Sequence, residues 1–224
     1  MTTTDYAAFL AHKTWQDTAS GFDAPDVNPQ LFPFQSDVVK WAARKGKAAL
    51  FLDCGLGKSA IQLEWARLVH DHTKGDVLVL APLAVAQQTR REARKFHIAA
   101  PVTICRTQDD VRPGINIANY EMLQHFDPAH FAGVVLDESS ILKSHDSKTR
   151  AKIIAMFANT PYRLSCTATP SPNDHMELGN QAEFLGVMSA TEMLAMFFVH
   201  DGGDTSQWQP NLFRNTTPIY PYTD

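Results

Sequence analysis

The chain has 224 residues, of which 44% are hydrophobic and 20% are charged, and these values are typical of a globular protein. It contains no apolar run of the roughly 18 residues that a membrane-spanning helix requires, so we expect no membrane partner. The formal net charge of −4 gives no support for nucleic-acid binding through bulk electrostatics, so any such contact must come from a local patch.

Short apolar segments alternate with helical patterns along most of the chain, which predicts an α/β fold. We expect strands at Ala48–Asp53, Asp76–Ala81, Val102–Cys105, Ile115–Ala118, Gly133–Asp137 and Arg163–Cys166. We expect helices near Gln35–Lys45, Lys58–His70, Ala84–Phe96, Ser147–Ala158, Asp174–Phe184 and Thr191–Val199. Because short apolar strands between helices favour a parallel sheet covered on both faces, the pattern predicts a three-layer sandwich with a mainly parallel central sheet.

The two ends of the chain depart from this pattern. Residues 1–30 hold a short helix-like stretch, Tyr6–Gln16, followed by a turn-rich segment, and we interpret them as an N-terminal extension. Residues 204–224 carry three prolines among scattered polar and aromatic residues, and we expect an irregular C-terminal tail. The domain itself is therefore predicted to occupy residues 31–203.

The three cysteines are far apart and show no metal-ligand spacing, so neither a zinc site nor a disulfide framework is expected. Cys54, Cys105 and Cys166 each end or line a predicted strand, where a small buried thiol is the expected state. The N-terminus also lacks the basic and apolar stretches of a signal peptide. We therefore expect a reduced protein in the cytoplasm.

A glycine-rich segment, Gly55-Leu56-Gly57-Lys58-Ser59, follows the first predicted strand and opens a predicted helix. Its two glycines let the backbone point several N–H groups at phosphate oxygens, and the helix N-terminus adds its dipole. Lys58 would place a positive charge on the β- and γ-phosphates, and the Ser59 hydroxyl would ligate Mg²⁺. The segment predicts a site for ATP and Mg²⁺, against the alternative of a chance glycine-rich loop.

An acidic pair, Asp137-Glu138, follows the apolar run Val134–Leu136. At the carboxyl end of a strand, Asp137 would hold Mg²⁺, and Glu138 would orient and polarise the attacking water. The alternative is a solvated acidic turn. Since the pair follows a phosphate loop in the same chain, we favour an ATP-hydrolysing site in which Lys58, Asp137 and Glu138 are catalytic.

With these motifs in this order, the chain resembles superfamily 2 helicases and translocases, particularly the Swi/Snf-like branch and its phage-encoded relatives. The resemblance covers about Leu31 to Gly203 and implies a RecA-like P-loop NTPase lobe. It assigns Gln35, in Leu31-Phe32-Pro33-Phe34-Gln35, to adenine recognition beside a nearby aromatic ring. One departure is Ser139-Ser140, which replaces the Ala-Asp, Ala-His or Gly-His that more often follows the acidic pair.

Three further segments match motifs of these motors. Arg163–Pro170 resembles motif III, so Thr167 and Thr169 would couple the γ-phosphate state to the nucleic-acid site. The segments Leu80–Leu83 and Ile117–Leu123 resemble motifs Ia and Ib, which implies nucleic-acid backbone contacts by Pro82, Leu83, Asn119 and Tyr120. Backbone contacts imply binding without sequence preference. The resemblance leans toward duplex DNA as the polymer.

Motors of this kind carry an arginine finger on a second RecA-like lobe, and residues after Gly203 do not resemble one. The resemblance therefore implies one lobe of a DNA helicase or translocase, whose second lobe is supplied elsewhere and whose ATP hydrolysis is weak without it. One alternative is a nucleotide-gated binding module from a truncated helicase that does not hydrolyse ATP. Another is a different P-loop enzyme, such as a small-molecule kinase.

Overall fold

The structure is a computed structural model that describes residues 19–82, 84–143, 147–170, 177–200 and 208–210. Six strands form one sheet in the order β1-β6-β5-β2-β4-β3, and every pairing in it is parallel. This confirms the predicted α/β class and the parallel sheet. The strands are β1 (Lys47–Phe51), β2 (Asp76–Ala81), β3 (Val102–Ile104), β4 (Ile115–Asn119), β5 (Phe131–Asp137) and β6 (Tyr162–Thr167).

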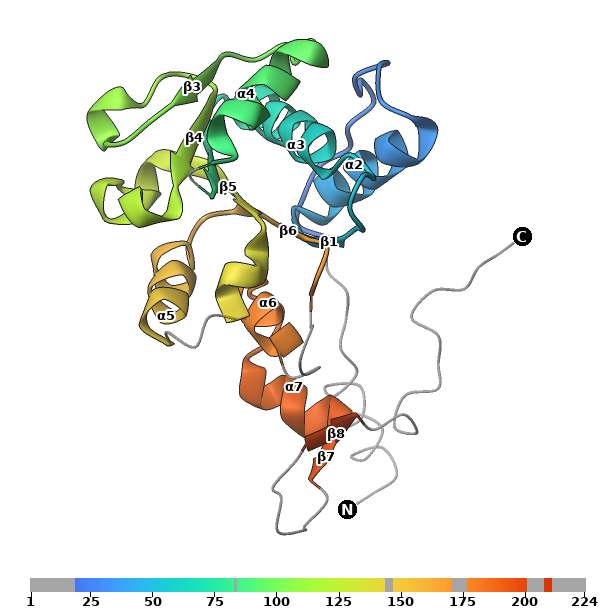
Figure 1. Ribbon diagram of the computed structural model, residues 1–224. Helices are drawn as coiled ribbons and strands as arrows, with labels where there is room; N and C mark the ends of the chain where they lie inside the picture. The colour runs from blue at the N-terminus through green and yellow to red at the C-terminus, as the bar shows by residue number, and fades with distance from the viewer. Residues whose placement is uncertain (1–18, 83, 144–146, 171–176, 201–207, 211–224) are drawn as a thin grey trace.

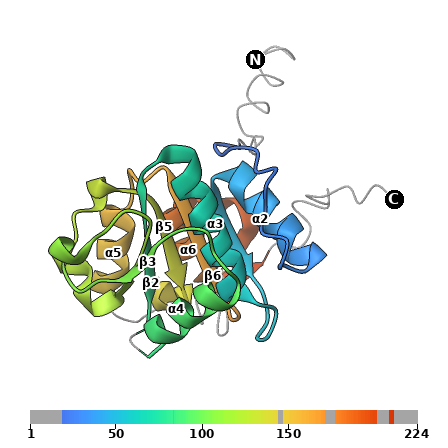
Figure 2. The same ribbon diagram turned by 90° about the horizontal axis from the view of Figure 1, so that it is seen from above.

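Helices cover both faces of this sheet, as Figures 1 and 2 show. One face carries α2 (Pro33–Lys45), α3 (Lys58–Thr73) and α4 (Ala86–Lys95), and the other carries α5 (Ser147–Met156) and α6 (Leu178–Leu185). The helix α7 (Ala190–Phe197) packs on α6. Short 3₁₀ turns are η1 (Gln108–Asp110), η2 (Tyr120–His125), η3 (Pro128–His130) and η4 (Ser139–Lys143). None of the helices described is both long and apolar enough to cross a membrane.

The strand β2 shows why its sequence is a continuous apolar run. Val77 and Val79 belong to the core on the side of α2 and α3, whereas Leu78 and Leu80 belong to the core on the side of α5 and α6. Successive side chains of a strand point to opposite faces, so a strand covered on both faces must be apolar at every position.

The described part of the predicted N-terminal extension is attached to the domain. The backbone N–H groups of Ser20, Gly21 and Phe22 donate to the last carbonyl groups of α2, at 3.0–3.1 Å. These carbonyl groups have no partner within the helix, so the segment supplies one. The Phe22 ring also stacks on His72 of α3, with ring centroids 4.0 Å apart.

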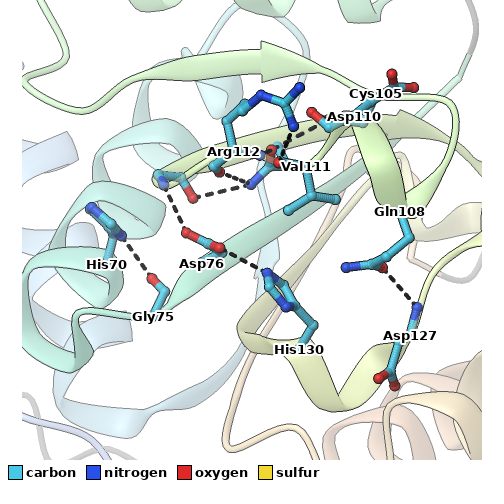
Figure 3. A network of polar contacts seen from close by, with 12 residues as sticks. His70, Gly75, Asp76, Cys105, Gln108, Asp110, Val111, Arg112, Asp127 and His130 are labelled. Carbon is cyan, nitrogen blue, oxygen red and sulfur yellow. Dashed lines mark hydrogen bonds and ion pairs between the residues drawn. The ribbon is translucent and has the colours of Figure 1, made fainter.

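A polar network holds the loops that lead into β2, β4 and β5 (Figure 3). The Asp76 carboxylate accepts the backbone N–H of Gly114 at 2.9 Å and contacts Nε2 of His130 at 2.9 Å. The side chain of Asn116 in β4 accepts the backbone N–H of Arg112, in the loop before that strand, at 3.0 Å and the Cys105 thiol at 3.3 Å. These bonds hold the loops that precede β2, β4 and β5 to one another.

Three expectations need correction. The thiol of Cys54 is exposed, because β1 ends at Phe51 and Cys54 lies in the loop beyond it, whereas the other two cysteines are buried as predicted. The helix predicted to reach Val199 ends at Phe197 and gives way to β7 (Phe198–His200). The prediction of an irregular tail is wrong at Trp208–Pro210, which form β8 and pair with β7 in antiparallel fashion. The predicted helix Tyr6–Gln16 lies outside the described residues.

Candidate active site

The sheet order brings three of the predicted motifs together. The strand β6 lies between β1 and β5, so the loops that follow these three strands are neighbours at the carboxyl edge of the sheet. The glycine-rich loop follows β1, the acidic pair ends β5, and Thr167 ends β6. Ligand sites of open α/β sheets lie at this edge.

The glycine-rich loop has the backbone that the sequence predicts. Gly55 and Gly57 have φ angles of 84° and 79°, which favour glycine, and α3 begins immediately afterwards at Lys58. The Lys58 ammonium donates to the backbone carbonyls of Leu52 at 2.9 Å and Asp53 at 3.2 Å. A side chain added at Gly55 would meet no atom within 4 Å, so the loop is open on that side. The loop is open, and its lysine donates to two uncharged carbonyl oxygens, so a phosphate group could take their place on the ammonium group.

Gln35 is buried and joins two segments. Its Nε2 donates to the carbonyl of Leu56 at 3.0 Å, and its Oε1 accepts the backbone N–H of Phe32 at 3.0 Å. The rings of Phe32 and Phe34 are stacked at a centroid distance of 6.4 Å and are 67% and 44% exposed. Two exposed aromatic rings therefore stand next to a glutamine whose amide is already bound to the phosphate loop.

The acidic pair sits in a strained turn. Asp137 is buried, and burial raises the pKa of its carboxyl group, as does the neighbouring charge of Glu138. Glu138 has a φ of 56°, a left-handed conformation that non-glycine residues seldom adopt. The Thr167 hydroxyl donates to Oε1 of Glu138 at 2.9 Å, and the backbone N–H of Thr169 donates to the Thr167 hydroxyl at 3.1 Å. The structure thus connects the predicted motifs II and III directly.

Tyr120, the first residue of η2, reaches the same turn. Its hydroxyl donates to the backbone carbonyl of Asp137 at 2.9 Å, and burial raises the pKa of Tyr120 well above its ordinary value, so the group stays a donor. The sequence predicts a nucleic-acid contact here, and nothing in the pattern signalled this internal bond. Sequence reasoning also missed Gln181 of α6, whose amide contacts Ser139.

Two of the other predicted contacts, Asn119 and Pro82, lie at the ends of β4 and β2, in the other half of the carboxyl edge. Asn119 ends β4 and lines a pocket of about 420 Å³, together with Gln87 at the start of α4 and Arg106. Pro82 follows β2 and is half-buried. Leu83 lies outside the described residues. The first turn of α4 and the Arg106 side chain are groups that can face a phosphate.

Comparisons with known proteins identify a family through a family model and a fold through solved structures. The family model of the SNF2-related domain matches residues 34–198. The SWI2/SNF2 ATPase core of Sulfolobus solfataricus in complex with dsDNA is 19% identical, with a TM-score of 0.64 over 81% of this chain and 41% of that chain. No curated protein sequence matches.

Two helicases share the same fold. The UvsW helicase from bacteriophage T4 is 14% identical, with a TM-score of 0.58 over 84% of this chain and 66% of that chain. The Hef helicase domain of Pyrococcus furiosus is 18% identical, with a TM-score of 0.58 over 70% of this chain and 36% of that chain. The chain thus spans less than two thirds of each of these structures. The matches confirm the RecA-like α/β fold predicted for the lobe.

Proposed function

Because this chain belongs to the SNF2-related domain family, we propose that it is the ATP-binding lobe of a DNA helicase or translocase, which hydrolyses ATP in response to nucleic acid. The observation that carries this proposal is the hydrogen bond from Thr167 to Glu138 at the edge where the glycine-rich loop also lies. A solvated acidic turn would not need a buried aspartate, a strained glutamate and a bonded threonine in one place.

The residues at this edge could perform the three tasks of an ATPase, which are to bind the phosphates, to bind Mg²⁺ and to orient water. The open loop at Gly55–Ser59 would receive the phosphates, and Lys58 would leave its two carbonyl partners to bind them. Ser59 and Asp137 would hold Mg²⁺, because hydroxyl and carboxylate oxygens are ligands that this ion prefers. When bound, the ion would neutralise charge on the phosphates. Glu138, held by Thr167, would orient the attacking water.

The exposed ring pair Phe32–Phe34 would pack on the adenine. Gln35 lies on the same segment and contacts the phosphate loop, so it would sense the base and the loop together.

The polymer would lie along the other half of the edge, on Pro82, Leu83, Asn119 and Tyr120 or their backbone. The similar Sulfolobus core was solved with dsDNA, which supports duplex DNA as the partner here. The net charge of −4 requires that these contacts be local, and backbone contacts would give no sequence preference.

A second RecA-like lobe would complete the site. An arginine finger contributes about 10³–10⁵ in rate, which is roughly 4–7 kcal/mol of the activation barrier. We therefore expect this chain alone to bind Mg·ATP, hydrolyse it slowly and not unwind a duplex.

The test is ATP binding and single-turnover ATP hydrolysis by the purified chain, with and without duplex DNA. Lys58→Ala should abolish both, whereas Lys40→Ala, which removes an exposed lysine from α2, should change neither. Duplex DNA should raise the rate more than an RNA strand of the same length. Binding that survives Lys58→Ala would refute the nucleotide site. Binding without hydrolysis, with or without DNA, would refute the ATPase and leave a nucleotide-gated module.

A further inference from the structure

The helix α6 holds the turn that carries the acidic pair through one buried amide. Nε2 of Gln181 donates both to the backbone carbonyl of Ser139 and to its hydroxyl oxygen, each at 3.1 Å. Gln181 is 2% exposed and Ser139 is fully buried. A carbonyl oxygen only accepts, so the nitrogen of the amide must face Ser139. Ser139, an unusual residue type directly after the acidic pair, therefore has a specific partner in Gln181.

The turn needs such a partner because it is strained. Glu138 precedes Ser139 and has a φ of 56°, which persists only where the surroundings determine it. The carbonyl of Glu138 accepts two long bonds, from the Ile141 N–H at 3.3 Å and from the Ser140 hydroxyl at 3.4 Å. The two bonds from Gln181 are shorter and come from a different element. They fix the residue next to the strained one.

Packing alone does not explain a glutamine at this position. In the described part of the structure, Oε1 of Gln181 is buried without a hydrogen-bond partner. Leaving a buried acceptor unpaired opposes folding, and an apolar side chain of the same length would avoid it. The amide is useful here only through its nitrogen.

We propose that Gln181 is a positioning residue for ATP hydrolysis. It acts through Ser139 to keep the Glu138 carboxylate on Thr167, where it would orient water, and it touches neither nucleotide nor metal. This inference rests on the proposed ATPase function. It goes beyond that function in placing control of the water-orienting carboxylate on α6, a helix outside the predicted motifs. It predicts a change in hydrolysis rate without a change in nucleotide affinity.

The experiment compares Gln181→Met with Phe184→Leu. Methionine keeps the length of the side chain and removes the donor. Phe184 is fully buried on the same helix, so Phe184→Leu disturbs the packing of α6 and leaves the polar contact in place. Each variant is measured for amide hydrogen exchange at residues 138–142, for Mg·ATP affinity and for single-turnover hydrolysis. Ser139→Ala, which keeps the carbonyl acceptor, is the intermediate case.

Gln181→Met should speed exchange at residues 138–142 by about 2- to 10-fold, because both bonds from Gln181 to Ser139 are lost. It should slow hydrolysis by about 10- to 100-fold, as expected for a misplaced group, with Mg·ATP affinity unchanged. Phe184→Leu, compared at an equal loss of stability, should change the exchange rate and the hydrolysis rate less than Gln181→Met does. Unchanged exchange in Gln181→Met would overturn the inference even if the chain hydrolyses no ATP. Equal loss of affinity and rate would also overturn it. Failure of the wild-type chain to bind ATP would instead refute the proposed function.

Discussion

The contact between Gln35 and the phosphate loop can be tested with two glycines that differ only in their surroundings. Gly55 and Gly57 both have positive φ angles, of 84° and 79°. A Cβ at Gly57 would lie 2.3 Å from Nε2 of Gln35, whereas one at Gly55 would meet no atom within 4 Å. Gly57→Ala must therefore displace the glutamine, and Gly55→Ala need not.

The expected magnitudes follow from these contacts. The left-handed conformation costs about 1–2 kcal/mol for alanine, and both variants bear this cost. In Gly57→Ala the Gln35 amide also loses its bond to the Leu56 carbonyl, and a buried polar group left unpaired costs about 1–3 kcal/mol. The total is about 2–5 kcal/mol for Gly57→Ala, against about 1–2 kcal/mol for Gly55→Ala. Each kcal/mol lowers the melting temperature of a chain of this size by about 2–4 °C.

The assay is thermal or urea unfolding of the two single variants, of Gln35→Ala and of the double variant Gln35→Ala/Gly57→Ala. Once Gln35 is shortened, the extra cost of Gly57→Ala should disappear, which gives a coupling energy of about 1–3 kcal/mol. Equal losses in Gly55→Ala and Gly57→Ala, or strict additivity in the double variant, would refute the reasoning.

Three further predictions concern the thiols, the buried carboxylate and the internal tyrosine. Iodoacetamide at pH 8 should modify the exposed Cys54 but not Cys105, since burial raises the pKa of the Cys105 thiol to about 11. Bound Mg·ATP should protect Cys54. Mass spectrometry that finds Cys105 modified in the folded protein would contradict this prediction. Asp137→Asn should raise the melting temperature at pH 7, because burial raises the pKa of Asp137 and its ionised form opposes folding above that pKa. The gain should shrink as the pH falls through the raised pKa, and stabilisation by Mg·ATP should vanish; a lower melting temperature at pH 7 would argue against it. Tyr120→Phe should lower stability by about 1 kcal/mol through the lost bond to Asp137 and leave DNA affinity unchanged, so weaker DNA binding in a gel-shift assay would show that the hydroxyl contacts the polymer.

Local pattern predicted most of the fold. All six strands of the sheet were found to within a residue or two of their ends, because strands buried on both faces are continuous apolar runs. The error at β7 has a simple cause. Met193 and Met196 follow a helical spacing, so the prediction continues the helix into Phe198 and Val199, whose residue types favour a strand.

The sequence placed the phosphate loop and the acidic pair at the ends of the correct strands, since both positions follow from local pattern. It could not place the partners that arrive from other elements. Glutamine is an ordinary residue on a helix, so Gln35 and Gln181 carry no signal of the carbonyls that they contact. The same holds for the Tyr120 hydroxyl, which reaches from η2 to the end of β5. The assignments of ATP, Mg²⁺ and DNA to individual residues stay predictions.

The sheet order also has a consequence for how the protein is made. The strand β1 is at one edge of the six-stranded sheet, and its partner there is β6, with Lys47 opposite Arg163. During synthesis the ribosome releases β1 and the phosphate loop early, but the strand that pairs with β1 emerges only after most of the domain. Contacts of such large sequence separation form late and slowly. A nascent chain halted before Tyr162 would therefore carry the phosphate loop on an unpaired strand, and nucleotide binding could help folding only once β6 has been synthesised.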